Sequence, residues 1–335
     1  MIKTKIKICV LEKKRGNFSI HEKFAHNEEI IDTTHQEVQH HIDALKEAGY
    51  DVIKLKWSNN IITDLKKMSV DLVFNVSSIV ETAILDELVI PYVGSDVIGC
   101  AVATDKALVK NLWLKNNLPT SPFVLAKSLK NCEIFKINKP FDYPLFIKPS
   151  QGRGSSGIDR NSIIFSYDEL IEQVEKRLTS INQPVIIEKF LDGREITCGV
   201  IGNGDRIRAL PLLEIIHEGK NKFLTFDKKE IDDDTFQCPA KLSPKQTQEL
   251  QKLAISAAKI ATIRDYGRVD MILTKTGVFL LEINSFAGLM CTPLEKPHSY
   301  MGFMAKAQNK KSSEFLDEIV KEALIRIDHY QDEEL

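Results

Sequence analysis

A glycine-rich segment that follows an apolar strand offers the clearest chemistry in this sequence. It runs from Lys148 to Gly157 and reads KPSQGRGSSG. Glycines let the backbone come close to an anion, so that its N–H groups can surround phosphate oxygens. We therefore predict a phosphate-binding flap with Lys148 at its base. A flexible surface loop is the alternative.

The same segment spells GxGxxG through Gly152, Gly154 and Gly157, which raises the alternative of a dinucleotide-dependent oxidoreductase. A dinucleotide fingerprint opens a helix directly after its strand. Here Ile158–Phe165 is expected to return as a strand, so the glycines are better suited to a hairpin-like flap. The oxidoreductase alternative rests on these three glycines alone.

Two acids and an amide are spaced to meet on one face of a predicted hairpin. Glu282 and Asn284 are two residues apart on one strand, and Asp270 and Arg268 lie on the neighbouring strand. Their oxygens are the hard ligands that Mg²⁺ takes, with nucleotide phosphates completing the shell, and Arg268 suits a developing negative charge. For Asp270 alone a solvated hairpin charge is the alternative. The apolar run Val278–Leu281 before Glu282 favours a site.

Weaker signals point to the base and the ribose of a nucleotide. The strand Val185–Leu191 carries Glu188, and Glu195 follows it. The backbone edge of a strand can read an adenine ring, and carboxylates accept hydrogen bonds from ribose hydroxyls. A buried strand with a charged end is commonplace, however. Lys106, in the first turn of a predicted helix, is by itself expected to face solvent.

These residues need a mixed α/β scaffold to hold them. Strand and helix patterns alternate up to Ser95, which predicts a parallel α/β sheet for residues 1–95 with its ligands beyond the carboxyl ends of the strands. Thr34 and Gly49 are the expected cap residues of the first helix. The elements predicted there are the strands Lys5–Leu11, Tyr50–Lys56, Leu72–Val76 and Pro91–Gly94 and the helices Thr34–Gly49 and Thr82–Leu88.

The rest of the chain is expected to mix helices with strands, in a central domain of residues 96–183 and a C-terminal domain of residues 184–335. The expected helices are Thr104–Asn116, Tyr167–Leu178, Ser243–Thr262 and Ser312–Tyr330. The expected strands are Pro144–Lys148, Arg160–Phe165, Pro184–Phe190, Glu195–Ile201, Ile207–Ile216 and a hairpin of Arg268–Leu273 with Gly277–Ile283.

Composition argues against several classes of protein. The 335 residues carry 45 Lys and Arg and 47 Asp and Glu, so a net charge of −2 gives no global attraction for nucleic acid or an anionic membrane. The apolar runs are far shorter than the ~20 residues of a membrane span, and the start lacks the apolar stretch of a signal peptide. Six scattered cysteines without a CxxC pair indicate reduced thiols. We expect a cytoplasmic protein with small-molecule partners.

Taken together, these segments resemble the ATP-grasp superfamily and, within it, the D-alanine–D-alanine ligase group. The resemblance runs from about Asp71 to the last predicted helix. Its markers, in the family's order and spacing, are Ile90–Ser95, Thr104–Lys106, Phe146–Ser150, Gly154–Ser156, Ile187–Lys189, Gly267–Asp270 and Leu281–Asn284. The resemblance implies three domains with ATP between the central and C-terminal ones, and usually a homodimer. The implied reaction activates a carboxylate as an acylphosphate, which an amine attacks to give an amide, ADP and phosphate.

The resemblance also implies a role for each matching residue. The implied nucleotide contacts are Lys106 and Lys148 at the phosphates, Gly154, Ser155 and Ser156 in the flap, Glu188, Lys189 and Leu191 at the adenine and Glu195 at the ribose. The implied ligands of two Mg²⁺ ions, or of Mn²⁺ in their place, are Asp270, Glu282 and Asn284. Arg268 and a backbone N–H near Gly288 would stabilise the acylphosphate and the tetrahedral intermediate, and Lys228 would belong to a mobile lid.

Other positions depart from the family where its amino-acid substrates bind. Leu11–Phe24 lacks the turn whose glutamate recognises the first D-alanine, and Pro293 stands where the family has the serine that grips the acceptor carboxylate. Since the ATP and metal residues are kept, we predict a carboxylate–amine ligase for amino-acid or dipeptide substrates other than D-alanine plus D-alanine. The alternatives are a D-alanine–D-alanine ligase of cell-wall synthesis and a nucleotide-binding ATP-grasp protein without ligase activity.

Three further features are interpreted without a role in the chemistry. The cluster His35, Glu37, His40 and His41 is expected to lie on the solvated face of a helix. Asp232–Asp234 lacks the glycine and the distal glutamate of an EF-hand and is expected to belong to the lid loop. Cys291, with no histidine at a recognisable spacing, is expected to be a passive thiol.

Overall fold

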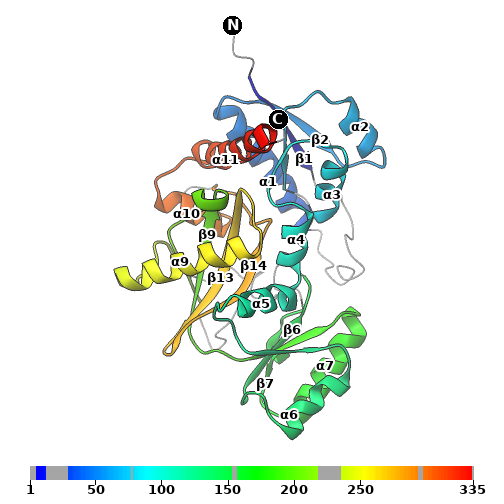
Figure 1. Cartoon of the computed structure of the whole chain (residues 1–335), viewed down its shortest axis with the longest axis vertical. Coiled ribbons are helices and arrows are strands. Elements are labelled where there is room, and N and C mark those ends of the chain that lie inside the picture. Colours follow the sequence, from blue (N-terminus) through cyan, green and yellow to red (C-terminus); the bar gives the residue numbers. More distant parts are fainter. Residues whose placement is uncertain are drawn as a thin grey trace.

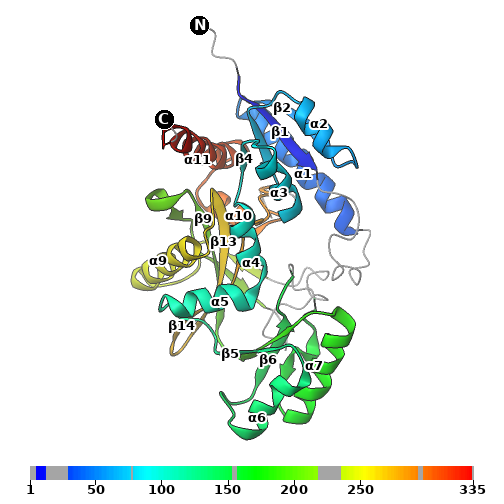
Figure 2. The same cartoon turned by 45° about the vertical axis from the view of Figure 1, so that its right-hand side comes forward.

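The computed structural model describes residues 5–12, 29–76, 78–152, 157–217, 235–292 and 297–333, with the side chains of residues 29–35 and 329–333 left out. Three β-sheets follow one another along the long axis of the molecule (Figures 1 and 2). The described part of the chain contains no helix that is both long enough and apolar enough to cross a membrane.

The first sheet is parallel and has the strand order β2-β1-β3-β4. This confirms the predicted α/β class with a parallel N-terminal sheet. Its elements are β1 (Lys7–Glu12), α1 (Glu29–Glu47), β2 (Asp51–Lys56), α2 (Ile61–Lys67), β3 (Leu72–Asn75), α3 (Ile79–Glu87) and β4 (Tyr92–Val93).

The boundaries of α1 were predicted correctly at one end only. The helix stops at Glu47 and Gly49 has φ +99°, a conformation that glycine adopts without strain. The predicted start at Thr34 is wrong, because the helix begins five residues earlier, at Glu29. The sequence Thr34-x-x-Glu37 imitates a capping box, but the Glu37 carboxylate accepts a hydrogen bond from the distant Leu289 N instead.

The last helix of the chain completes the core of this first sheet. In α11 (Ser312–Glu333), five residues are fully buried: Phe315, Leu316, Ile319, Val320 and Ala323. They share one apolar cluster with Ile8, Val10, Val38 and Leu45 of β1 and α1. Figure 1 shows α11 (red) lying beside α1 at the same end of the molecule. Residues from the two ends of the sequence therefore build one core.

The second sheet has the order β12-β11-β9-β13-β14, and β10 pairs with β9. Its strands are β9 (Arg194–Ile201), β10 (Arg208–Ala209), β11 (Leu213–Ile216), β12 (Thr235–Gln237), β13 (Tyr266–Thr274) and β14 (Gly277–Asn284). The predicted hairpin is therefore present, whereas the single strand expected at Ile207–Ile216 is divided into two. The apolar side of α9 (Pro244–Ile260) packs on this sheet, and α10 (Tyr300–Ala307) contacts β9 and β11.

The third sheet is antiparallel, with the order β5-β8-β6-β7. It contains β5 (Phe123–Ala126), β6 (Leu145–Pro149), β7 (Ile163–Ile164) and β8 (Val185–Lys189), and it packs on α6 (Ile134–Ile137) and α7 (Tyr167–Ile181). The strand predicted at Arg160–Phe165 is short because a 3₁₀ turn capped by Asp159 occupies Arg160–Ser162. The predicted division at residue 184 falls directly before β8, a strand of this same sheet. The domain boundaries near 95 and 184 stay a prediction.

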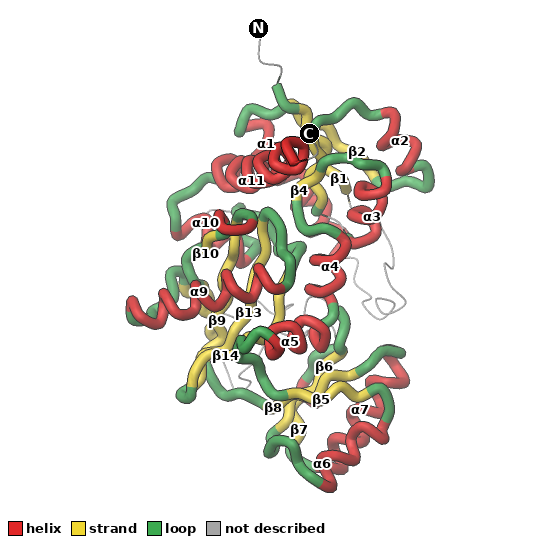
Figure 3. Tube along the Cα trace, in the orientation of Figure 1, coloured by secondary structure: helices red, strands yellow, loops and turns green. Residues whose placement is uncertain are grey.

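Two short helices connect the first sheet with the third. The helix predicted at Thr104–Asn116 is present as α5 (Lys106–Lys115), and a second helix that was not predicted, α4 (Val97–Thr104), precedes it. Asp105 separates the two helices because its backbone is extended and its side chain accepts a hydrogen bond from Leu108 N, as the N-cap of α5. Both helices pack on β14, and Figure 3 shows them running past the second sheet toward the third.

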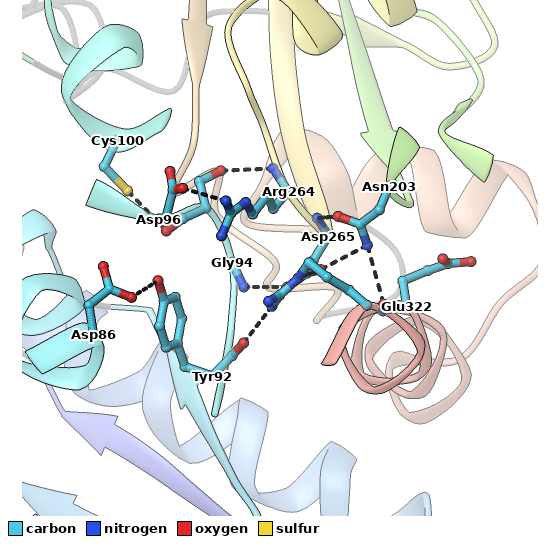
Figure 4. A network of polar contacts seen from close by, with 11 residues as sticks. Asp86, Tyr92, Gly94, Asp96, Cys100, Asn203, Arg264, Asp265 and Glu322 are labelled. Carbon is cyan, nitrogen blue, oxygen red and sulfur yellow. Dashed lines mark hydrogen bonds and ion pairs between the residues drawn. The ribbon is translucent and has the colours of Figure 1, made fainter. Parts of the chain in front are cut away.

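A buried polar network joins the first two sheets to α11. Asp265, which is fully buried at the start of β13, accepts hydrogen bonds from Gly94 N, Asn203 Nδ2 and the Arg326 guanidinium. Figure 4 shows how residues from four separate parts of the sequence meet there. The network fixes α11 against both sheets.

Candidate active site

The hairpin of β13 and β14 places four of the predicted residues on one face. Arg268 pairs with Asn284 and Asp270 pairs with Glu282 in the antiparallel register. Directly opposed residues of an antiparallel pair, and residues two apart on one strand, point to the same side of the sheet. The register therefore brings together the two carboxylates, the amide and the guanidinium.

Asp270 is the most strongly held of these side chains. Arg268 donates to it through Nε and Nη2, both at 2.8 Å, and Asn284 Nδ2 donates at 3.1 Å. Thr197 Oγ1 on β9 donates at 2.5 Å. Burial disfavours the charge of Arg268, but the adjacent Asp270 carboxylate outweighs burial and raises the pKa of the guanidinium. Arg268 thus stays cationic, with its guanidinium carbon 4.8 Å from the centre of the Tyr300 ring.

Lys106 reaches the same region from α5. It is buried, with 7 % of its surface exposed, so the expectation that a lysine in a first helical turn faces solvent is wrong here. Its Nζ donates to the carbonyl oxygen of Gly152 at 2.9 Å and lies 3.6 Å from Glu282 Oε2. Burial lowers the pKa of Lys106, and the Glu282 carboxylate opposes that change. Lys106 therefore connects the glycine-rich segment with the hairpin.

Lys148 on β6 belongs to a second buried charge group. Its Nζ lies 3.0 Å from Glu188 Oε2 on the neighbouring β8, and Lys110 Nζ on α5 lies 2.7 Å from Glu188 Oε1. Burial disfavours all three charges. The Glu188 carboxylate nevertheless raises the pKa of Lys148, and the two lysines lower the pKa of Glu188. Glu188, predicted at the adenine, has its carboxylate between two ammonium groups.

Sequence reasoning missed Lys110. A lysine four residues after Lys106 on an amphipathic helix has the pattern of a solvent-exposed position, yet its side chain is fully buried. Its position one turn after Lys106, on the same helix face, was the available signal.

The start of the glycine-rich segment is attached to the N-cap of α5. Ser150 Oγ and Gln151 Nε2 both donate to the Asp105 carboxylate at 3.1 Å, and Lys106 N donates to the Ser150 carbonyl oxygen at 2.9 Å. A hollow beside these contacts is lined by Ala103, Thr104, Lys106, Gly152, Glu282, Ile283, Asn284, Ser285 and Phe286. Gly154, Ser155 and Ser156 lie outside the described residues.

The remaining predicted nucleotide residues follow β8. Lys189 has an exposed side chain, and its backbone N–H donates to the Pro122 carbonyl oxygen. Leu191 is partly buried in the link to β9. Glu195 on β9 lies 2.8 Å from Nε2 of His217, a residue that the sequence did not single out. Lys228 lies outside the described residues.

The family model described as "D-ala D-ala ligase C-terminus" matches residues 112–321, more than half of this chain. The chain belongs to the D-alanine–D-alanine ligase family. This confirms the predicted family and enzyme class, that of ATP-grasp ligases that form carbon–nitrogen bonds.

Individual relatives agree with this assignment. The chain is 33% identical to a D-alanine–D-alanine ligase of Methylacidiphilum infernorum over 240 residues, 71% of each chain. It is 34% identical to one of Syntrophobacter fumaroxidans over 212 residues, 63% of this chain and 67% of the relative.

Solved structures show the same fold. The ligase of Bacillus anthracis complexed with ATP has a TM-score of 0.75 at 20% identity, covering 98% of this chain and 99% of that chain. The VanG D-Ala:D-Ser ligase of Enterococcus faecalis has a TM-score of 0.74 at 20% identity, covering 95% and 99%.

In this family member, α1 contacts the loop that follows β14. The Glu37 carboxylate accepts a hydrogen bond from Leu289 N at 3.4 Å, and His40 Nε2 accepts one from Cys291 N at 3.3 Å. His40 Nδ1 lies 3.2 Å from Thr292 Oγ1. Glu37 Oε1 also lies close beside Gly288, 3.6 Å from where a β-carbon would stand. The helix thereby holds the loop with the predicted oxyanion-binding backbone.

The predicted surface cluster on α1 is therefore wrong for three of its residues. Glu37 and His40 contact the loop, and His41 is fully buried against Phe74, with ring centres 5.4 Å apart. The physical reason is that the 288–292 loop covers Glu37 and His40, while β3 covers His41 through Phe74. The side chain of His35 lies outside the description. Cys291 is buried, and burial raises the pKa of its thiol to about 12, as expected of a passive cysteine.

The side chains on the hairpin face supply the kind of oxygen ligands that a hard cation such as Mg²⁺ takes. The described residues contain no group of three or more His, Cys, Asp or Glu side chains that could hold a metal ion by themselves. A magnesium ion in this ligase would accordingly be held by the Asp270 and Glu282 carboxylates, the Asn284 amide oxygen and phosphate oxygens. The donor set fits, because Asn284 directs its amide nitrogen at Asp270 and both Glu282 and Asn284 line the hollow.

Proposed function

We propose that this chain is an ATP- and Mg²⁺-dependent ligase that joins the carboxylate of one amino acid to the amine of a second, through an acylphosphate. One observation carries the proposal: two buried lysines from different elements, Lys106 and Lys148, lie close enough to Glu282 for its carboxylate to act on both of their charges. Ammonium groups that can bind phosphate therefore lie next to carboxylate oxygens that can bind Mg²⁺. This arrangement suits phosphoryl transfer, because that reaction depends mostly on positioning and charge neutralisation.

The residues divide the work as follows. Lys106 and Lys148 hold the phosphates, with Gly154, Ser155 and Ser156 closing over them. Lys189 and Leu191 line the adenine pocket together with Glu188, and Glu195 holds the ribose. The bound nucleotide supplies the phosphoryl group that activates a carboxylate, with the metal neutralising its charge.

Arg268 is the residue that faces the reacting carboxylate in this proposal. Its charge is secured by Asp270, and a guanidinium of fixed geometry can neutralise the negative charge that develops when an amine attacks. The backbone N–H groups near Gly288 give a second source of stabilisation, since Glu37 and His40 hold that loop in place. Lys228 is assigned to a lid over the site.

The names of the relatives favour D-alanine in both substrate positions, over the different pair that the sequence departures predicted. We propose D-alanine with D-alanine as the reference pair. A second candidate is D-alanine with a different acceptor, which is favoured by Pro293 at the position of the family's acceptor-binding serine.

The test supplies ATP, Mg²⁺ and D-alanine, alone and with a panel of D- and L-amino acids, and follows ADP release and product mass. Lys148→Ala and Glu282→Ala should each lower kcat/KM at least about 100-fold. Lys275→Ala, at the exposed hairpin tip, is the matched control and should keep full activity. Turnover that survives both site substitutions would overturn the mechanism, and ATP binding without any amide product would leave a nucleotide-binding protein.

A further inference from the structure

Lys110 carries a charge that the proposed mechanism does not use. It lies on α5 one turn after Lys106 and is fully enclosed. Its Nζ donates to Thr120 Oγ1 at 2.6 Å and to the Leu280 carbonyl oxygen at 3.4 Å, and it lies 2.7 Å from Glu188 Oε1. Withdrawing an ammonium group from water is unfavourable unless a carboxylate and hydrogen bonds compensate it. The surroundings of Lys110 provide both.

The contact of Lys110 with Glu188 affects the orientation of the Glu188 carboxylate toward Lys148. Each oxygen of the Glu188 carboxylate has a different lysine: Oε1 lies 2.7 Å from Lys110 and Oε2 lies 3.0 Å from Lys148. A carboxylate held at one oxygen cannot rotate freely, so the other oxygen has a fixed direction. The contact with Lys110 therefore fixes the direction of the Glu188 oxygen that faces the Lys148 ammonium group.

Lys110 also changes the charge of the site. The two neighbouring ion-pair groups, Lys106–Glu282 and Lys110–Glu188–Lys148, together contain three lysines and two carboxylates, and Lys148 and Glu188 act electrostatically on Lys106. They therefore have one surplus positive charge, which an anionic ligand would balance. Without Lys110 the positive and negative charges would balance, and Lys148 would be the only lysine paired with Glu188.

The same side chain links the two sheets that border the site. Thr120 Oγ1 donates to the Leu280 carbonyl oxygen on β14 of the second sheet, and Glu188 belongs to β8 of the third. Lys110 contacts all three residues. A purely structural cross-link is therefore the competing explanation, and an experiment must separate it from a role in nucleotide binding.

We propose that Lys110 is a positioning residue for the nucleotide: it orients the Glu188 carboxylate, and through it the Lys148 ammonium group, toward the phosphates. The inference rests on the proposed function for the identity of the ligand. It predicts that Lys110 and Glu188 act as one unit in nucleotide affinity.

The test measures binding of a non-hydrolysable ATP analogue with Mg²⁺ by calorimetry, for the wild type, Lys110→Met, Glu188→Gln and the double variant. Each single substitution should weaken binding at least about tenfold, and the double variant should bind within about threefold of the weaker single variant, because both remove one contact. Trp113→Phe is the matched control. Trp113 is buried on the same helix and donates to the Ala257 carbonyl oxygen, away from the site. It should lower Tm and leave the affinity within about twofold of the wild type.

The pH profile gives a readout that a cross-link would not change. Burial and the neighbouring Lys148 lower the pKa of Lys110 to about 8. The Glu188 and Glu282 carboxylates act in the opposite direction and limit this change. Lys106 lies in the neighbouring ion-pair group with Glu282. The affinity of the wild type for the analogue should therefore fall as pH rises through 8, and that fall should be smaller in Lys110→Met.

Three outcomes decide the inference. Lys110→Met binding the analogue within twofold of the wild type, or effects of Lys110→Met and Glu188→Gln that multiply in the double variant, would overturn it. If Lys110→Met does not fold, the double variant, which leaves no unpaired carboxylate, must still bind at least tenfold more weakly. A wild type that binds the analogue but forms no amide when given ATP, Mg²⁺ and the amino acids would contradict the ligase proposal alone, whereas a wild type that does not bind the analogue would contradict both.

Discussion

Arg326 and Asp265 meet side-on, with Nε 2.9 Å from Oδ1 and Nη2 2.8 Å from Oδ2. The aspartate is fully buried, and the same arginine nitrogen Nη2 donates to the Tyr92 carbonyl oxygen at 2.8 Å. The pair therefore connects α11 with β4 and with the start of β13 (Figure 4). Two-point contact gives the pair a fixed geometry that a lysine could not reproduce.

We predict that Asp265→Asn lowers the free energy of unfolding by about 3 kcal/mol, because it leaves the partly buried Arg326 without its carboxylate. Asparagine tolerates the φ of +61° at this position, so backbone strain does not contribute. Denaturant unfolding gives the measurement. Arg206→Met, which breaks the more exposed pair with Glu322, is the control and should cost less than about 1 kcal/mol. Equal losses in the two variants would contradict a special role for the buried pair.

Glu282→Gln should raise the Mg²⁺ concentration needed for half-maximal turnover at least about tenfold, because the amide replaces a charged oxygen ligand by a neutral one. Removing divalent ions with a chelator should abolish turnover in every variant. Calorimetry of the ATP analogue with and without Mg²⁺ provides a readout besides activity. Glu249→Gln, on the exposed side of α9, should behave like the wild type. A magnesium dependence that is the same in Glu282→Gln and the wild type would remove Glu282 from the metal site.

Substitutions on α1 should affect the acceptor amino acid and leave ATP alone. His40→Ala removes the contacts with Cys291 N and Thr292, each worth about 1 kcal/mol, and should raise the KM of the second amino acid about tenfold. Glu37→Gln keeps an oxygen that can accept from Leu289 N but removes the charge, so it separates loop positioning from electrostatics. Gln39→Ala, on the exposed face between them, is the control. A KM for ATP that rises as much as the KM for the acceptor would contradict this assignment.

Buried His41 should make the fold sensitive to acid. Burial, with a smaller contribution from His40, lowers the pKa of His41 from 6.5 to about 3. Between pH 6.5 and pH 3 the unfolded chain binds a proton on His41 that the folded protein does not bind. The free energy of unfolding therefore keeps its full value above pH 6.5 and falls as the pH decreases toward 3. The loss approaches about 1.4 kcal/mol per pH unit.

Denaturant unfolding at pH 8 and pH 5 checks this prediction. The wild type should lose about 2 kcal/mol more than His41→Leu between the two pH values. The exposed His298→Asn serves as the control and should keep the pH dependence of the wild type. A His41→Leu variant with an unchanged pH dependence would show that other groups are responsible.

Local patterns predicted the parts of the site that lie on regular strands. The alternation around Asp270 and Glu282 gave the shared face correctly, because side-chain direction in a hairpin has a period of two. The start of α5 was predicted to within two residues, whereas α4 was missed because Val97–Thr104 is apolar nearly throughout and shows no helical alternation of polar and apolar residues. Lys106 was expected to face solvent and Lys110 was not singled out, because their burial depends on Gly152, Glu282 and Glu188, which come from distant segments.

Long-range packing explains the remaining errors. The polar side of α1 looked solvated because the sequence gives no sign that the 288–292 loop and Phe74 of β3 will cover it. The 3.6-residue period of a helix predicts which residues share one face of the helix. It does not predict which other elements pack on that face. The contacts of Glu37, His40 and His41 therefore had to come from the three-dimensional structure.

The joint core of α1, β1 and α11 has a consequence for how the protein is made. A ribosome synthesises the first sheet well before residues 312–327, and at 5–20 residues per second the interval from residue 95 to residue 312 lasts roughly 10–45 s. During that time the apolar surface around Ile8, Val38 and Leu45 lacks Phe315, Ile319 and Val320. The core of the first sheet therefore stays incomplete in the nascent chain until α11 has been synthesised, and its apolar surface is exposed for that time.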